Sequence, residues 1–188
     1  MQLNIDATIK GVSMDEKELA KEYKETIALF ETKHIQDVKS IIQRFIKPLK
    51  AKNVNKKLDV NGKSGFYMIF CSNEPKDNNC LCRIECRKTT FFCVYRGHSS
   101  SIQNRVTKHL FFDSSINDNC MRIKLNGNRY NINIESQALF ENNSLFPDTF
   151  PNWKWKYIKI EFDSKQGLRE IYEKAFDELY NRPSFSDK

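Results

Sequence analysis

Two amphipathic stripes near the start of the chain predict a pair of helices. Ser13 and Glu16 have the spacing of a capping box, which begins a helix. Apolar residues then recur every three or four positions, the spacing that places them on one helical face. The first stripe contains Leu19, Tyr23, Ile27 and Phe30, and the second contains Ile35, Val38, Ile41, Ile42, Phe45, Ile46 and Leu49. Pro48 is expected to end or kink the second helix.

From Gly65 onward, most of the apolar pattern is typical of strands. Short apolar or alternating runs indicate strands at 66–70, 81–84, 91–95, 121–125, 130–134 and 155–162. Asn126-Gly127-Asn128 predicts a hairpin between two of them. Helices are expected at 102–112 and 168–180. The pattern predicts an α+β fold with a small central mixed or antiparallel β-sheet flanked by helices. We expect an N-terminal helical region with a basic linker over residues 1–60 and the main domain over 61–188.

Composition favours a globular, basic chain. Of 188 residues, 39% are hydrophobic, and 31 Lys and Arg against 24 Asp and Glu give a formal net charge of +7. Such a surface attracts polyanions, namely DNA, RNA or anionic membranes. Basic residues gather at Arg44, Lys47, Lys50, Lys52, Lys56, Lys57 and Lys63. This run fits an arm that contacts phosphates and fits a solvated linker equally well, and the sequence leaves both readings open.

The chain has no apolar run of membrane-spanning length and no signal peptide at its start. We therefore expect a cytoplasmic protein without a membrane partner. In that compartment the six cysteines are expected to be free thiols. Cys80, Cys82 and Cys86 have a spacing that fits no common zinc motif, so buried thiols are favoured over structural zinc.

Two tripeptides carry candidate chemistry. Gly65-Phe66-Tyr67 opens one predicted strand, and Tyr95-Arg96-Gly97 closes a later one. Arg105 follows Gly97 by eight positions, and His109 comes four later, so the two share one helical face. Phosphodiester hydrolysis needs a group that activates water and a cation that neutralises developing charge. Tyr67 and Tyr95, expected at facing strand positions, could put two phenolic oxygens into one cleft beside an arginine, whose planar fork suits phosphate.

This ordered set resembles the core of the GIY-YIG nucleases, over roughly residues 65–183. The resemblance implies that Tyr67 accepts or relays a proton from the attacking water. It implies that Tyr95, Arg105 and His109 position and neutralise the phosphate. It also implies that a Glu on a later helix holds one Mg²⁺ or Mn²⁺. Glu173 is favoured over Glu170 because apolar residues and then a proline follow it at the family's spacing, namely Phe176, Leu179, Tyr180 and Pro183.

The resemblance therefore implies a metal-dependent DNA endonuclease. The compact chain, by analogy of architecture, favours a Type II restriction enzyme. The residues expected to contact nucleic acid are Arg96, His98, Lys108 and Lys63. Arg96 departs from the family, which has an apolar residue at this place. Cutting both strands favours a homodimer through the N-terminal stripes, unless those stripes pack on their own chain. The alternative function is a non-catalytic nucleic-acid-binding module with the same fold, in which these tyrosines, Arg105 and His109 are ordinary packing or surface residues.

Overall fold

The computed structural model describes residues 34–46, 50–58, 62–113, 122–125, 128–136, 138–141, 144–146, 153–162 and 166–186. The chain divides into two compact units, Met1–His34 and Ile35–Lys188. The predicted helix with the first apolar stripe lies outside the described residues. In the described part, no helix is long and apolar enough to cross a membrane.

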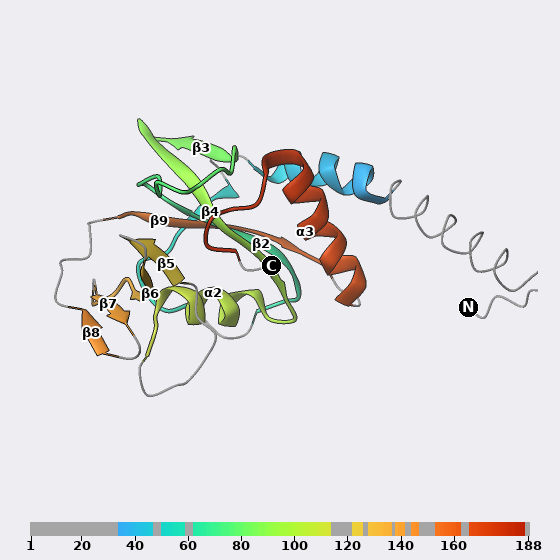
Figure 1. Cartoon of the computed structure of the whole chain (residues 1–188). Helices are drawn as coiled ribbons and strands as arrows, with labels where there is room; N and C mark the ends of the chain where they lie inside the picture. The colour runs from blue at the N-terminus through green and yellow to red at the C-terminus, as the bar shows by residue number, and fades with distance from the viewer. Residues whose placement is uncertain are drawn as a thin grey trace, which may run out of the picture. The chain divides into compact units, whose positions relative to one another are not determined.

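A five-stranded antiparallel sheet forms the centre of the second unit, in the order β1-β9-β2-β4-β3. Its strands are β1 (Lys52–Asn53), β2 (Gly65–Cys71), β3 (Arg83–Cys86), β4 (Thr89–Ser99) and β9 (Trp155–Glu161). The side chains of β2 are buried along its whole length, because the strand is paired on both sides and covered on both faces. Figure 1 shows β2 between the long strands β4 and β9.

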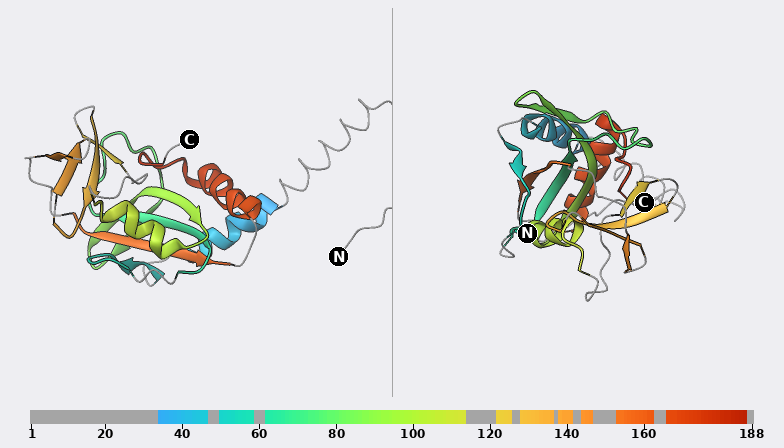
Figure 2. Two further views of the ribbon diagram at one scale, coloured as in Figure 1. Left: turned by 90° about the horizontal axis from the view of Figure 1, so that it is seen from below. Right: turned by 90° about the vertical axis from the view of Figure 1, so that its left-hand side faces the viewer.

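One face of the sheet is covered by α2 (Ile102–Leu110). Successive residues of a strand point to opposite faces, and Tyr67, Ile69 and Cys71 share a hydrophobic cluster with α2. The helix contributes Ile102, Val106 and Leu110, spaced to lie on one side of it. Figure 2 shows α2 lying across the strands.

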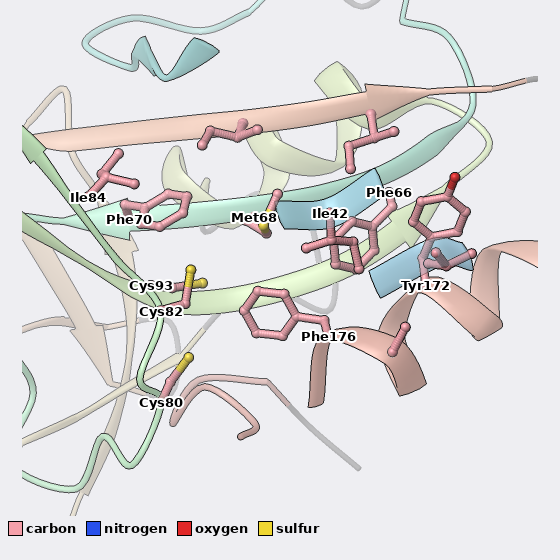
Figure 3. Packing of buried hydrophobic residues seen from close by; sticks show 14 of the residues in the cluster. Ile42, Phe66, Met68, Phe70, Cys80, Cys82, Ile84, Cys93, Tyr172 and Phe176 are labelled. Atoms are coloured by element: carbon pink, nitrogen blue, oxygen red, sulfur yellow. The ribbon is translucent and has the colours of Figure 1, made fainter. Parts of the chain in front are cut away.

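The opposite face is covered by α3 (Gln166–Tyr180) and by a helix over residues 34–45. Phe66, Met68 and Phe70 of β2 pack here against Phe176 and Ile42 (Figure 3). Lys39 of the first helix also forms a 2.7 Å ion pair with Glu178 of α3. The described members of the second apolar stripe therefore pack on their own chain, and Leu49 lies outside the described residues.

A second antiparallel sheet, in the order β5-β6-β7-β8, follows α2 in the chain. Its strands are β5 (Arg122–Leu125), β6 (Asn128–Asn133), β7 (Ala138–Glu141) and β8 (Ser144–Phe146). Leu125 pairs with Asn128 across the predicted hairpin. Backbone hydrogen bonds join the residues just after α2 to β6, with Phe112 donating to Ile132 at 2.9 Å. The α+β class is thus confirmed, and the central sheet is antiparallel.

Candidate functional site

The first part of the site joins the central strand to α2. Tyr67 of β2 is fully buried, and its hydroxyl lies 2.9 Å from Nε2 of His109. The Tyr95 ring packs on both, with its centroid 4.3 Å from that of His109 and 6.0 Å from that of Tyr67. The sequence placed the two tyrosines at facing positions. In the observed register Tyr67 faces Gly97 and Tyr95 faces Ile69, so the tyrosines are diagonal neighbours on one face of the sheet.

Gly97 makes this packing possible. A Cβ at this position would lie 2.8 Å from the Tyr67 hydroxyl oxygen and 2.9 Å from Cε1 of Tyr95. Both separations are shorter than ordinary van der Waals contact, so a larger residue would push the rings apart. The glycine of the second motif therefore lets the Tyr67 ring lie against β4 and bring its hydroxyl beside Tyr95.

Burial sets the protonation of this group. It raises the pKa of Tyr67 well above its usual value, and the nearby Arg105 charge opposes that shift. Burial likewise raises the pKa of Tyr95. Burial, and then the Arg105 charge, lowers the pKa of His109 to about 3. At neutral pH the site therefore contains two neutral phenols, a neutral imidazole and the permanent charge of Arg105.

The second part of the site is an ion-pair network centred on Arg96. Arg96 donates two hydrogen bonds to Asp177, at 2.9 and 2.7 Å, and one to Oε2 of Glu173 at 2.9 Å. Arg182 reaches Asp177 from the other side at 2.9 Å. Burial by itself would raise the pKa of Asp177, but the hydrogen bonds and charges of Arg96 and Arg182 outweigh it, and the net shift is downward. The network holds the Glu173 carboxylate in a fixed place.

His98 completes the second part. Its Nδ1 lies 3.0 Å from Oε1 of Glu173, and its side chain is 22% exposed. The bond holds the ring of His98 on α3, while Arg96 holds the other carboxylate oxygen. His98 therefore presents a restrained imidazole that solvent reaches.

The two parts lie on opposite faces of β4. Strand alternation places Tyr95 and Gly97 on the α2 face, and Arg96 and His98 on the α3 face. β3 pairs with β4 only from Thr89 to Phe92. Among the described residues, no strand pairs with the β3 side of β4 after Arg96. Burial is the main cause of the raised pKa of Tyr67 and of Tyr95, and the Glu173 charge adds to it, so the two parts are close enough to act on one another.

The structure thus gathers most of the predicted catalytic residues. Tyr67, Tyr95 and His109 are in contact, Arg105 acts on all three through its charge, and the charge of Glu173 acts on the two tyrosines. His109 differs from the prediction in one respect. It is only 2% exposed, neutral and bonded to Tyr67, so it is placed to act on the tyrosine rather than to neutralise a phosphate.

The residues predicted to contact nucleic acid separate into two groups. Arg96 is only 5% exposed, and both carboxylates of the network bind its guanidinium. In this structure the donors of Arg96 already serve Glu173 and Asp177, and its contact with nucleic acid stays a prediction. His98 and Lys108 are partly exposed, and Lys63 is exposed. The carbonyl of Lys63 accepts a hydrogen bond from Ile102, which places this lysine beside the first turn of α2.

Asp177 and Arg182 also belong to the site, although the sequence alone does not single them out. Asp177 follows Glu173 by four positions in α3, so the two carboxylates share one helical face. The second signal is Arg96, the middle residue of Tyr95-Arg96-Gly97, where the resemblance leads one to expect an apolar residue. A buried arginine requires carboxylate partners, and an i, i+4 pair of acids on a packed helix is a suitable place to find them.

In proteins Mg²⁺ binds carboxylate oxygens and keeps several waters. Both oxygens of Glu173 already accept bonds, one from Arg96 and one from His98. A cation at either oxygen would displace one of them and would lie near the Arg96 guanidinium. Among the described residues, no group of three His, Cys, Asp or Glu is placed to hold a metal. The arrangement around Glu173 therefore does not fit a magnesium ion.

The predicted thiols lie elsewhere. Cys80, Cys82 and Cys93 are free, buried and part of the hydrophobic cluster beneath α3 (Figure 3).

No protein-family model, curated protein or solved structure matches this chain.

Proposed function

We propose that this protein is an endonuclease that hydrolyses phosphodiester bonds in DNA. The observation that carries the proposal is the bonded pair of Tyr67 and His109, with Tyr95 and the Arg105 charge beside it. A buried tyrosine that serves only as packing needs no such neighbours. A tyrosine that moves a proton needs a hydrogen-bond partner and a nearby cation that favours its ionised form.

The protonation states point to a relay. A phenol with a raised pKa is not a standing base, so the proton of the attacking water would have to pass through Tyr67. Its hydroxyl accepts that proton while its own moves to Nε2 of His109. Arg105 binds the phosphate oxygens through its planar fork. The bound phosphate also offsets the Arg105 charge, which is one of the two causes that lower the pKa of His109.

The substrate follows from charge. The chain has a formal net charge of +7, and Lys63 and Lys108 lie on or next to α2, which also carries Arg105 and His109. Lysines around the site would bind the phosphates that flank the cut. Within this class we propose a restriction-type endonuclease. The Mg²⁺ or Mn²⁺ of the resemblance stays a prediction, and no step here depends on it.

One observation favours a second function. Glu173 is neutralised by Arg96, as expected of a chain that keeps the fold and binds nucleic acid without cutting it. A nicking assay on supercoiled plasmid, with Mg²⁺, with Mn²⁺ and with EDTA, separates the two functions. An endonuclease gives nicked or linear product in at least one condition. A protein that shifts plasmid mobility but gives no product in any condition is the binding module.

Arg105→Gln tests the assignment of the site within that assay. Removing one pre-organised donor from a transition state costs about 10²–10³-fold in rate. Arg122→Gln is the matched control, because Arg122 lies on β5 of the second sheet and is exposed. The Arg105 variant should lose cleavage while the Arg122 variant keeps it. Equal activity of both variants would remove Arg105 from the site.

A further inference from the structure

We infer that His98 is the general acid of this reaction, held in place by Glu173, and that it protonates the oxygen that leaves the phosphorus. The inference rests on the proposed function and assigns Glu173 a positioning role. The first observation behind it is the 3.0 Å hydrogen bond between Nδ1 of His98 and Oε1 of Glu173.

A carboxylate on Nδ1 fixes the ring and the tautomer of a histidine and leaves Nε2 as the reacting atom. His98 meets this description, and its side chain is 22% exposed, so its ring is accessible to a substrate. His109 does not meet it, because Nε2 of His109 is already bonded to Tyr67 and the residue is 2% exposed.

The carboxylate that holds His98 is itself rigid. Its second oxygen accepts a hydrogen bond from Arg96, which Asp177 holds through two further bonds. This arrangement would serve poorly as a metal site, because the guanidinium neutralises the carboxylate. It serves well for orienting an imidazole, since both the position and the rotation of the carboxylate are fixed.

Tyr67 and His98 lie on opposite faces of the sheet at β4. In phosphoryl transfer the attacking and leaving oxygens lie roughly in line, on opposite sides of the phosphorus. Tyr67, which would receive the proton of the water, belongs to the α2 face. His98 belongs to the α3 face of the same part of β4. A phosphate at this edge would therefore have the proton acceptor on one side and the proton donor on the other.

The step balances without any other reactant. The water oxygen bonds to phosphorus as the bond from phosphorus to the leaving oxygen breaks. The water proton passes to Tyr67 as the hydroxyl proton of Tyr67 moves to Nε2 of His109, and the Nε2 proton of His98 passes to the leaving oxygen to form an alcohol. His109 then returns its proton to solvent through Tyr67, and His98 regains one. Glu173 takes part only through His98.

A bridging sulfur in the substrate tests this role. DNA is prepared with sulfur in place of the 3′ or the 5′ bridging oxygen at the mapped cleavage position. A thiolate leaves without a proton, because a thiol is a far stronger acid than an alcohol. His98→Asn keeps a donor for Glu173 but has no proton to give. We expect this variant to cut ordinary DNA about 10²–10⁴-fold more slowly and to cut one sulfur isomer at the wild-type rate.

His34→Asn is the matched control, because it removes a histidine outside the site. This variant should cut ordinary DNA and each sulfur isomer as the wild type does. Glu173→Gln should show a smaller defect on ordinary DNA, rescued by the same sulfur isomer. A His98→Asn defect of equal size on all substrates would overturn the inference and leave the proposed function standing. Mn²⁺ binding by the wild type that Glu173→Gln abolishes, measured by isothermal titration, would also overturn it. A wild type that cuts no substrate would overturn both proposals.

Discussion

The hydroxyl of Tyr67 lies 2.9 Å from Nε2 of His109, and this bond joins the central strand of the sheet to the helix that carries Arg105. The two side chains are fully or almost fully buried. Because both are buried in this structure, the loss of either leaves the other without its partner. The bond is at once part of the core and the first step of the proposed proton path.

Tyr67→Phe should separate these two roles. Removing the hydroxyl takes away the proton relay, so we expect cleavage to fall about 10²–10⁴-fold. It also leaves Nε2 of His109 buried without a partner, at a cost of about 1–3 kcal/mol in unfolding free energy. Tyr157→Phe is the matched control, since Tyr157 is a buried tyrosine on the neighbouring strand β9. Plasmid nicking and urea unfolding measure the two effects, and full activity of Tyr67→Phe would contradict the relay.

The stability of the protein should fall in acid because of His109. The pKa of this residue is lowered from 6.5 to about 3 in the folded protein. Between these values the unfolded chain binds a proton that the folded chain does not bind. The contribution of His109 to the free energy of unfolding is therefore complete above about pH 6.5 and is lost as pH falls toward 3. In urea unfolding from pH 7.5 to pH 4, His109→Gln should give a shallower acid decline than the wild type. Parallel curves for the two proteins would contradict this.

The elements that hold the first part of the site could be predicted because their signals are local. The apolar run from Phe66 to Phe70 and the helical spacing of Arg105 and His109 are each confined to a few residues. By contrast, β1 has two residues and β8 has three, too few for a periodic pattern. The register of β2 on β4 could not be predicted from the sequence either, and this register makes Tyr67 and Tyr95 diagonal neighbours.

The second part of the site depends on contacts between distant residues. Arg96 and Asp177 are 81 positions apart, and nothing in either segment alone specifies their pairing. The sequence marked Arg96 as unusual but could not say whether a phosphate or a carboxylate would neutralise it. That choice depends on how α3 packs over the sheet, which is decided by burial of residues such as Tyr172 and Phe176.

Gly97→Ala should disturb the site more than the fold. The added methyl would lie 2.8 Å from the Tyr67 hydroxyl oxygen, so the ring must move, at a cost of about 1–3 kcal/mol. Gly65→Ala is the informative comparison. Its Cβ would lie 2.1 Å from the backbone oxygen of Ile160, and its φ is +147°, so there the strands themselves must separate. Thermal unfolding should show the larger loss for Gly65→Ala, while Gly97→Ala should still fold but cut poorly. A folded, fully active Gly97→Ala would show that the tyrosine packing is not needed.

Arg96→Met should destabilise the protein more than Arg182→Met, although both arginines bind Asp177. The Arg96 side chain is 6% exposed, and its loss leaves two partly buried carboxylates without their shared cation, which costs about 3 kcal/mol. Arg182 is 43% exposed, and pairs of that kind contribute roughly 0–1 kcal/mol. Arg96→Lys should recover only part of the loss, because lysine cannot form the two parallel bonds to Asp177. Urea unfolding of the three variants gives the order, and equal losses for Arg96→Met and Arg182→Met would contradict it.

The lysines that precede β2 are predicted to contact DNA phosphates. Lys52, Lys56 and Lys57 are exposed, and Lys52 belongs to β1 at the edge of the sheet. Lys50 is a poorer probe, because its ammonium already lies 3.7 Å from the centroid of the Phe45 ring. Each lysine that neutralises a phosphate releases counterions, so the slope of log affinity against log salt changes by about 0.9 per contact on duplex DNA. If all three contact DNA, replacing them together with Gln should reduce that slope by about 2.7.

The matched control for this lysine experiment replaces Lys76, Arg87 and Lys88 with Gln, which removes the same charge. Arg87 and Lys88 form the turn before Thr89, at the end of β4 away from His98. Fluorescence anisotropy with a labelled duplex, from low to high salt, measures both triple variants against the wild type. A lower slope only for the first triple variant identifies the run as a phosphate-contacting arm. Equal slopes for all three proteins make the run a solvated linker, and DNA contacts must then come from the residues around Lys63 and Lys108.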